Sequence, residues 1–305
     1  MKPLDMPPMP PALGDVRSAG PDDREHLSNL IQLEAHVHRH LDWKPALDWI
    51  GKEPFIVLED DSRIVGALAC PPDPESIGWL RLFVFASHLS GEGAWQLLWS
   101  AACRQLEIQA CEIAAAIVTQ PWLEPILKRS GFELLNHIVL MEMNIGSVRP
   151  ARDGGFSVIR EMLPSDLPRV ADLDAQAFDP LWRNSLDALS SALKQASYAS
   201  VAQDGPDLVG YQLSTGGPFG THLARLAVLP ALQRQGLGAA LVNDLIEHIP
   251  RDREPRITVN TQSDNSASHA LYARLGFRRT GERFPVYVLQ ILGGKRSVPE
   301  SGGVH

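Results

Sequence analysis

The sequence carries a long internal repeat, which constrains the fold more than any other feature. Val65-Gly66 recurs as Val209-Gly210, and Arg81-Leu82-Phe83-Val84 recurs as Arg225-Leu226-Ala227-Val228, each about 144 residues later. Collinear matches at a constant spacing indicate a duplicated domain, and this period is far too long for a solenoid repeat. A chain of 305 residues is also long enough for two ordinary domains. The repeat therefore predicts two related domains in tandem.

Segments rich in proline or glycine mark the expected limits of the two domains. Residues 1–14 are crowded with proline and residues 293–305 are rich in glycine and polar groups, so both are predicted to be tails. The soft stretch at 146–155 is predicted to be the linker between domains. The first domain is therefore expected at 15–145 and the second at 156–292.

Composition excludes several classes of function. The net charge of −8 gives no basic footprint for a nucleic acid. No apolar run is long enough to span a bilayer, and the N-terminus lacks the apolar core of a secretory signal. Cys70, Cys103 and Cys111 form no CxxC pair, which fits a reducing compartment. We therefore expect a cytoplasmic monomer or homodimer without nucleic-acid or membrane partners.

The second half shows the alternating apolar patterns of a mixed α/β domain. Helices are predicted from the apolar positions Leu167, Val170 and Leu173, from Leu186, Leu189 and Leu193, from the stretch around Leu237–Ile249, and over Ser266–Leu275. Strands are predicted at Ser157–Glu161, Tyr198–Ala202, Leu208–Leu213, His222–Leu229, Arg256–Thr261, Phe277–Gly281 and Val286–Ile291.

The most specific chemical signal is a glycine-containing loop between a predicted strand and a predicted helix. It reads Gln233-Arg-Gln-Gly236-Leu-Gly238, a Gln-x-x-Gly-x-Gly pattern. Glycines let the backbone approach a ligand closely, and the free N–H groups at a helix start suit a diphosphate. By itself, the loop is equally consistent with a plain turn before a core helix.

A second motif follows about thirty residues later. It runs from Thr261 through Asn265 and Tyr272 to Gly276-Phe277, an N-x6-Y-x3-GF pattern. With both motifs in this order and spacing, residues 156–292 resemble the GNAT superfamily of acetyl-CoA-dependent acyltransferases, nearest to the ribosomal-protein alanine N-acetyltransferase type. The resemblance implies two tandem GNAT domains, each an α/β domain with a mixed, mostly antiparallel sheet flanked by helices.

The resemblance also implies roles for individual residues. The strand residues Leu226, Ala227 and Val228 would offer backbone groups to the pantetheine arm of the cofactor, from a strand splayed from its neighbour. The loop residues that would cradle the CoA diphosphate are Arg234, Gln235, Gly236, Leu237, Gly238 and Ala239. Asn265 would contact the cofactor, cap the helix that follows it, or do both. Tyr272 would donate a proton to the departing thiolate; the alternative is an aromatic ring packed under the sheet.

Two parts of the expected site are poorly specified. Asn260 falls where the alanine-acetyltransferase type carries a glutamate base, and an amide cannot serve as a base at neutral pH. His222 and ordered water are the candidates that remain. The acceptor site would draw on aromatic and basic residues that are equally consistent with core packing: Phe178, Trp182, Arg183, Phe284 and Tyr287.

The first half resembles a degenerate copy of the second. Aligned at the repeat spacing, Glu92 replaces Gly236, Ala94 replaces Gly238, and Leu127 replaces Tyr272. A carboxylate beside a diphosphate is repelled, so this half is predicted to keep the fold without the acetyl-CoA chemistry. It is expected to pack against the second half and to shape the acceptor cleft.

Three other features of the first half are expected to be structural. His36-Val-His38-Arg-His40 is interpreted as the solvated face of a helix rather than a metal site, because no acidic partner motif follows. The stretch from Trp43 to Trp49 is interpreted as an apolar helix face, and Cys103 and Cys111 as core residues. No metal site is therefore expected.

The function implied by the resemblance is an acetyl-CoA-dependent N-acetyltransferase. It would move an acetyl group to a primary amine of a small molecule or peptide by direct attack of the amine. One alternative is a tandem acetyltransferase of the mycothiol-synthase kind, which acetylates a small thiol-conjugate amine. Another is a non-catalytic acyl-CoA-binding sensor, in which Asn260 reflects lost catalysis.

Overall fold

The structure is a computed structural model that describes residues 14–145, 158–217, 220–249 and 256–291. The predicted linker and C-terminal tail, and all but the last residue of the predicted N-terminal tail, lie outside the described residues. Within the described ranges, no helix is both long and apolar enough to cross a bilayer.

The two halves share a similar order of elements. The first half contains β1 (Asp15–Ser18), α1 (Arg24–Leu33), β2 (His36–Arg39), β3 (Phe55–Asp60), β4 (Arg63–Ala69), β5 (Ile77–Trp79), β6 (Leu82–Phe85), α2 (Gly91–Ile108), β7 (Ile113–Ile117), α3 (Leu123–Arg129) and β8 (Glu133–Asn144). The second half contains β9 (Val158–Glu161), α4 (Leu167–Ala177), α5 (Leu186–Gln195), β10 (Tyr198–Asp204), β11 (Asp207–Gly217), β12 (Gly220–Val228), α6 (Leu237–His248), β13 (Arg256–Gln262), α7 (Ser266–Arg274) and β14 (Arg278–Gln290). The orders differ in that the first half has β2 where the second has α5, and β5 and β6 where the second has β12 alone. The helices predicted for the second half are confirmed, as is its mixed α/β class.

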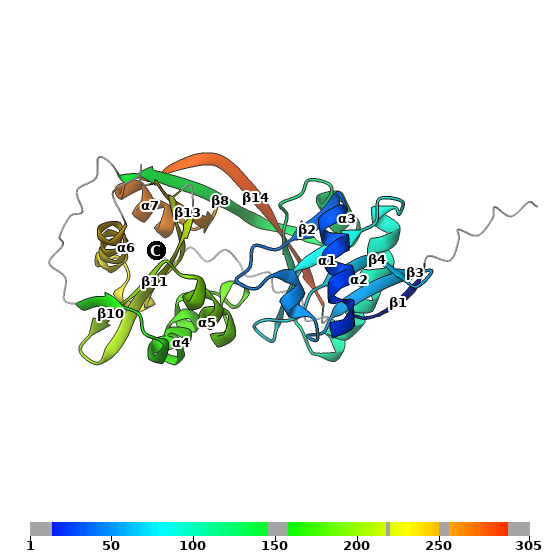
Figure 1. Cartoon of the computed structure of the whole chain (residues 1–305). Coiled ribbons are helices and arrows are strands. Elements are labelled where there is room, and N and C mark those ends of the chain that lie inside the picture. The colour runs from blue at the N-terminus through cyan, green and yellow to red at the C-terminus, as the bar shows by residue number, and fades with distance from the viewer. Residues whose placement is uncertain (1–13, 146–157, 218–219, 250–255, 292–305) are drawn as a thin grey trace, which may run out of the picture.

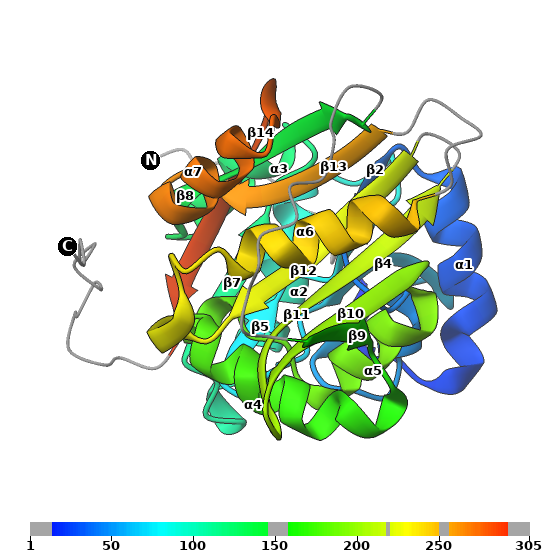
Figure 2. The same ribbon diagram turned by 90° about the vertical axis from the view of Figure 1, so that its left-hand side faces the viewer.

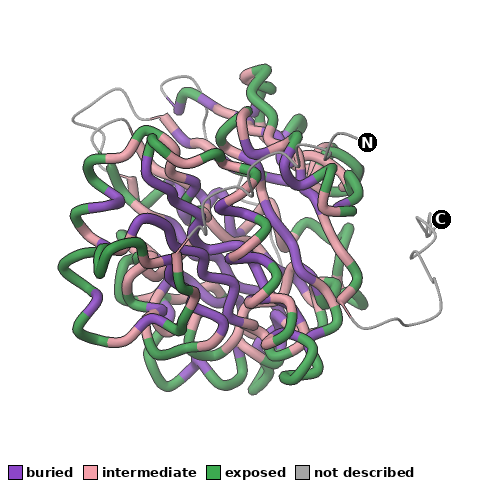
Figure 3. The backbone as a smooth tube through the Cα atoms, turned by 90° about the vertical axis from the view of Figure 1, so that its right-hand side faces the viewer, coloured by how far each residue is buried: buried purple, intermediate pink, exposed green. Residues whose placement is uncertain are grey.

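The strands form two sheets, of which the larger spans both halves (Figure 1). A five-stranded sheet of the first half has the order β1-β3-β4-β6-β2, and a nine-stranded sheet has the order β5-β7-β14-β8-β13-β12-β11-β10-β9. Seen from the side of the first half, the buried residues gather along the central strands and the exposed ones lie outside them (Figure 3).

The two halves exchange their last strands. Ile138–Asn144 of β8 pairs with β13 of the second half, and Val286–Gln290 of β14 pairs with β7 of the first half. The long strands β8 and β14 therefore run side by side from one half to the other (Figure 1). The two strands predicted at Phe277–Gly281 and Val286–Ile291 are one strand, interrupted by register shifts. The boundaries between two independent domains stay a prediction, because each half completes its sheet with a strand of the other.

A duplicated ion pair marks the start of each half. Arg17 contacts Asp23 at 2.7 Å, and Arg160 contacts Asp166 at the same distance. Each carboxylate also accepts the backbone N–H of the residue three positions before it. The arginine hydrogen bond lowers the pKa of each of these carboxyl groups below the ordinary value of 3.8.

These ion pairs predict how stability depends on acid. Because each folded-state pKa is depressed, the stabilisation is present above the ordinary carboxyl pKa and is lost as the pH falls through the lower folded value. Replacing Asp166 with Asn is expected to remove about 1 kcal/mol at pH 7, a modest value because Arg160 is partly exposed. Urea unfolding should show a larger loss at pH 7 than at pH 3, and Asp207→Asn, at an exposed carboxylate, is the control.

The first half departs from the sequence prediction at its histidines. His36–Arg39 is the strand β2, not a helix, and it pairs antiparallel with β6. His38 is buried and its Nε2 lies 3.3 Å from the carbonyl oxygen of Leu80. A four-residue strand gives too short an alternation to be distinguished from a helix face by its sequence.

Two other predictions for the first half are partly wrong. Trp49 ends a short 3-10 turn at Ala46–Trp49 and lies in the core, while Trp43 lies outside any helix. Cys111 is buried as expected, but Cys103 is only partly so. Trp43 and Trp49 therefore do not form the expected apolar helix face.

Candidate functional site

Strand β12 has an open edge where the sequence predicts contacts to a pantetheine arm. It pairs with β11 along most of its length but with β13 only over Thr221–Leu223. The N–H of Leu229 donates to Val209, so by the alternation of an antiparallel pair the peptide groups of Leu226 and Val228 face away from β11. The predicted separation of β12 from β13 is therefore present, and the amides of Leu226 and Val228 point into the gap between these strands. Ala227, also predicted here, has its peptide groups turned toward β11.

Helix α6 begins beyond this edge with an uncapped N-terminus. Gly236 is its N-cap residue, has a φ of 90°, and supplies no side chain to the first-turn N–H groups. A Cβ atom at Gly236 would meet nothing within 4 Å, so the space in front of the helix is open. Free N–H groups at the positive end of a helix form an anion site. The helix lies across the strands of the second half (Figure 2).

The other residues of the loop have different structural roles. Arg234 also has a positive φ, of 62°, and is exposed with Gln235 beside the helix start. Gln233 donates its side-chain N–H to the carbonyl oxygen of Val228 at 3.1 Å, which ties the loop to the end of β12. A Cβ atom at Gly238 would lie 3.2 Å from Leu271 of α7, so this glycine permits close helix packing. Of the two glycines in the loop, Gly236 is the one that leaves open space for a ligand.

Tyr272 and Asn265 reach the site from α7. Tyr272 is 4% exposed, and its ring lies 5.4 Å from that of Phe277. Burial raises the pKa of its hydroxyl, which is therefore protonated at neutral pH. Asn265 caps α7 by accepting the N–H of Ser268 at 2.9 Å, so its capping role is present. Both residues line the same cavity, together with Leu226.

This cavity, of about 250 Å³, lies between the two halves. It brings together three of the residues predicted for an acceptor site, Phe178, Trp182 and Arg183, and the base-position residue Asn260. The first half contributes residues that the sequence did not single out for an acceptor site, among them His40, Asp73, Trp79 and Arg81. The expectation that the first half shapes the acceptor cleft agrees with this lining.

Three predicted candidates lie elsewhere. His222 is not among the residues that line the cavity, and its Nδ1 lies 2.8 Å from Thr258. Phe284 packs among apolar side chains that include Trp182. Tyr287 lies in the core of the first half and donates its hydroxyl to Glu124, because β14 carries it there. His222 as a base and Tyr287 as an acceptor-site residue are therefore not supported.

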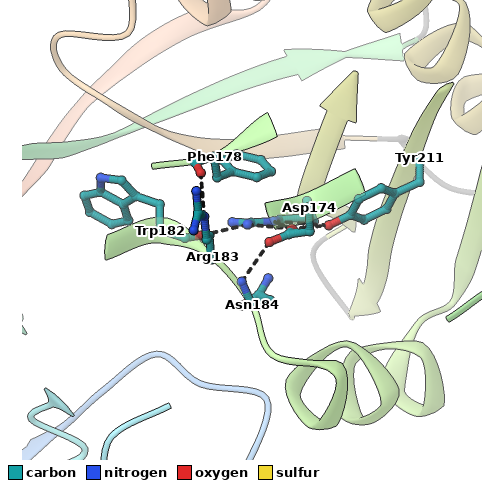
Figure 4. Close-up of polar contacts among 7 residues, drawn as sticks. Asp174, Phe178, Trp182, Arg183, Asn184 and Tyr211 are labelled. Carbon is teal, nitrogen blue, oxygen red and sulfur yellow. Dashed lines mark hydrogen bonds and ion pairs between the residues drawn. The ribbon is translucent and has the colours of Figure 1, made fainter. Parts of the chain in front are cut away.

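A buried ion pair that the sequence did not reveal holds the cavity wall in place. Asp174 is fully buried and accepts Arg225 Nη2 at 2.6 Å, the hydroxyl of Tyr211, and the backbone N–H of Asn184 (Figure 4). Arg225 directly precedes Leu226 on β12, so the open strand is tied to α4 and to the segment that follows this helix. Burial, with the neighbouring carboxylate, raises the pKa of Tyr211.

The same arginine fixes the segment that carries the predicted acceptor residues. Its Nη2 donates to the carbonyl oxygen of Trp182 at 2.7 Å, and its guanidinium carbon lies 3.5 Å from the ring centre of Phe178. Arg183 donates its Nε to the carbonyl oxygen of Phe178 at 3.0 Å (Figure 4). Residues 178–184 are thus pinned against the strand that would carry the acyl group.

Breaking this pair is expected to destabilise the fold. Asp174→Asn leaves Arg225 buried without its full charge partner, and removing one member of a buried pair costs about 3–5 kcal/mol. Thermal unfolding of this variant, compared with Asp172→Asn at the exposed neighbouring carboxylate on α4, measures the effect. Equal melting temperatures for the two variants would show that the ion pair has no such role.

The matching region of the first half is closed. Strand β6 is paired with β4 on one edge and with β2 on the other, where Phe83 lies opposite His38 and Phe85 opposite His36. The backbone edge that is open on β12 is therefore occupied by a strand of the chain itself. This pairing supports the prediction that the first half does not bind acetyl-CoA.

The first half also lacks the free helix start, although not for the reason given by the sequence alignment. Ser90 is the N-cap residue of α2 and accepts the N–H of Gly93 at 3.0 Å. The loop before it, residues 86–89, is shorter than residues 229–235 before α6. Glu92 therefore lies inside the first turn, paired with Arg129, and is not the counterpart of Gly236.

The strands show the same error of alignment. Phe85 lies opposite Gly66, as Val228 lies opposite Gly210. The match of residues 81–84 to 225–228 is thus one residue out of register with the paired strands.

Comparison with known proteins places the second half in a family. The model of the "Acetyltransferase (GNAT) family" matches residues 160–277. The chain is 32% identical over 129 residues to the N-alpha-acetyltransferase RimI of Mycobacterium tuberculosis, covering 40% of this chain and 79% of that protein. It is 25% identical over 132 residues to the ribosomal protein bS18-alanine N-acetyltransferase of Escherichia coli K12, covering 43% and 88%.

The fold of the whole chain also has a solved counterpart. A tandem GNAT protein from the clavulanic acid biosynthesis pathway aligns with 92% of this chain and with all of its own length. The TM-score is 0.61 and the sequence identity 14%. This likeness confirms the predicted tandem arrangement of two related α/β folds.

Proposed function

Because this chain belongs to the acetyltransferase (GNAT) family and is an acyltransferase, we propose that it transfers an acetyl group from acetyl-CoA to a primary amine of a small molecule or peptide. The proposal places a single working site in the second half. The first half supports this site and binds no acetyl-CoA.

The observation that carries the proposal is a series of three features along β12, which together form the proposed path of the cofactor. The uncapped start of α6 lies at one end, the free amides of Leu226 and Val228 lie along the strand, and the cavity with Tyr272 lies at the other end. Acetyl-CoA has a matching order of groups, with an anionic diphosphate, an amide-bearing arm and a reactive acyl end. The open space at Gly236 admits the diphosphate.

Each part of the path has a defined task in this proposal. Residues Arg234 to Ala239 hold the diphosphate, and the amides of β12 hold the arm. Bound acetyl-CoA supplies an acetyl group activated as a thioester. The strand N–H that faces the acyl carbonyl polarises it, and Tyr272 gives its proton to the sulfur as the amine takes the acetyl group. Asn265 caps α7 and so fixes the start of the helix, which sets the position of Tyr272.

The acceptor occupies the cavity between the two halves. Its walls combine the aromatic rings of Phe178, Trp79 and Trp182 with arginines that are already paired. Aromatic side chains with a few fixed polar groups are typical of small-ligand sites. The cavity therefore suits a small amine or the end of a peptide.

The proposal is tested by binding and turnover measured on the same protein. Calorimetry with CoA is expected to show one site per chain, and thiol release from acetyl-CoA is expected with at least one acceptor from a panel of amines, peptides and thiol-conjugate amines. Binding without turnover on every acceptor would favour a non-catalytic sensor. Absence of CoA binding would contradict the proposal as a whole.

A further inference from the structure

The cavity between the two halves receives its proton-accepting side chains from the first half. Among its described lining residues, the imidazole and carboxylate groups are those of His40, Asp42 and Asp73. The second half contributes arginines, Tyr272 and neutral groups such as Asn260, whose amide is not a base. The half that carries the open strand therefore lines the cavity with no proton acceptor.

Both acidic residues lie beside Arg81. Asp42 accepts Arg81 Nη1 at 2.8 Å and the indole N–H of Trp49 at 3.1 Å. Asp73 lies in the electrostatic field of the same guanidinium, to which its backbone oxygen also accepts a hydrogen bond. Two donors therefore occupy the carboxylate of Asp42, and Asp73 is held beside the same arginine through its backbone.

His40 is in a different state. Its ring stacks on Trp79 with centroids 5.0 Å apart, and the Trp79 ring lies 5.5 Å from that of Trp182. This row of rings crosses from the first half to the wall of the second. The Nδ1 atom of His40 is enclosed without a hydrogen-bond partner, so no contact commits its tautomer. Burial, followed by Arg81 and His38, lowers its pKa well below 6.5, and the ring is neutral at pH 7.

The strand that closes β6 also places His40. Strand β2 ends at Arg39, and the backbone N–H of His40 donates to the carbonyl oxygen of Arg81 at 3.0 Å, which continues the pairing by one residue. The pairing brings His40 to the end of the sheet that faces the cavity. The segment from His36 to His40 therefore covers the edge of β6 that corresponds to the open edge of β12, and it also places an imidazole at the cavity.

We propose that His40 accepts the proton that the acceptor amine loses, so that the first half completes the active site. This inference rests on the proposed acetyl transfer. The amine nitrogen bonds to the acetyl carbon as the carbon–sulfur bond breaks, and one N–H proton passes to the imidazole of His40, directly or through a water. Tyr272 protonates the sulfur. His40 then releases its proton to solvent, and the Tyr272 phenolate regains one, which leaves an amide and a thiol.

The test compares His40→Gln with His36→Gln. His36 begins β2, the strand that leads to His40, and stacks on Phe85 at 4.7 Å, but it does not line the cavity. His40→Gln is expected to lower kcat about 100-fold, the usual scale for a positioned proton acceptor. The Kd for CoA by calorimetry and the melting temperature are expected to stay at the wild-type values. The control should keep wild-type kcat.

A second arm separates chemistry from structure. His40→Gly is expected to regain activity when free imidazole is added, because the missing base can enter the cavity. Wild-type kcat in His40→Gln, failure of imidazole to restore His40→Gly, or a larger loss of kcat in Asp73→Asn than in His40→Gln would overturn this inference. If the wild-type protein binds CoA and transfers the acetyl group but these results are not obtained, only the proposed role of His40 is wrong. If wild type does not bind CoA, the proposed function itself fails.

Discussion

Gly236→Glu is expected to weaken CoA binding by at least about 100-fold, measured by calorimetry. The new carboxylate would stand at the start of α6, in the open space where the diphosphate is proposed to lie. A carboxylate placed beside the diphosphate costs on the order of a few kcal/mol of binding free energy. A change of about 1.4 kcal/mol corresponds to a tenfold change in Kd. Residue 236 also has a positive φ, so any side chain there adds backbone strain.

Two comparisons separate charge from strain at this position. Gly236→Gln has nearly the same size and the same strain without the charge, so it is expected to bind CoA more tightly than Gly236→Glu. Gly281→Glu provides a matched control, because Gly281 has a φ of 93°, equally open space, and no place in the cavity lining. Equal CoA affinity in Gly236→Glu and wild type would exclude this loop as the diphosphate site.

Tyr272→Phe is expected to lower kcat about 100-fold while leaving the Kd for CoA unchanged. Tyr272 lines the cavity, burial keeps its hydroxyl protonated, and a positioned acid contributes on this scale. The ring is kept by phenylalanine, so its packing against Phe277 is preserved. Steady-state thiol release and calorimetry on the same samples provide the two readouts.

Tyr287→Phe is the control for this substitution. The substitution removes a hydroxyl that donates to Glu124, and Tyr287 lies in the core of the first half. The control is expected to retain wild-type kcat. Full activity in Tyr272→Phe would show that the thiol leaves without this residue, and the ring would then have only a packing role.

The local sequence predicted the elements of the second half because each is specified by short-range chemistry. Gly236 needs a positive φ at the start of α6, Asn265 caps α7, and the apolar spacing of α6 fixes its buried face. Leu226, Asn265 and Tyr272 were predicted from two motifs separated in sequence, and the structure brings them to one cavity. Their roles in binding and catalysis stay predictions.

Long-range pairing escaped the sequence analysis. The exchange of β8 and β14 is decided by which edge each strand meets, and a strand carries no local mark of its partner. Strand β2 was mistaken for a helix because its histidines follow one another at intervals that fit both structures. The shorter loop before Ser90 could not be seen in an alignment that assumed one constant spacing.

The buried ion pair of Asp174 and Arg225 was missed for a related reason. The two residues lie on α4 and β12, and nothing in the sequence around Asp174 distinguishes it from the exposed Asp172 two positions earlier. Arg225 did appear in the repeat, which marked the segment without giving a role to the arginine. A charged residue repeated beside an apolar strand was the one available signal of this contact.

The most direct measurement is a crystal structure of the full chain with CoA bound. The account predicts one CoA per chain, with its diphosphate at the N-terminus of α6 and its arm between β12 and β13, hydrogen-bonded to Leu226 and Val228. The edge of β6 should stay paired with β2. CoA lying against the first half, or at any place away from the open edge of β12, would contradict the account.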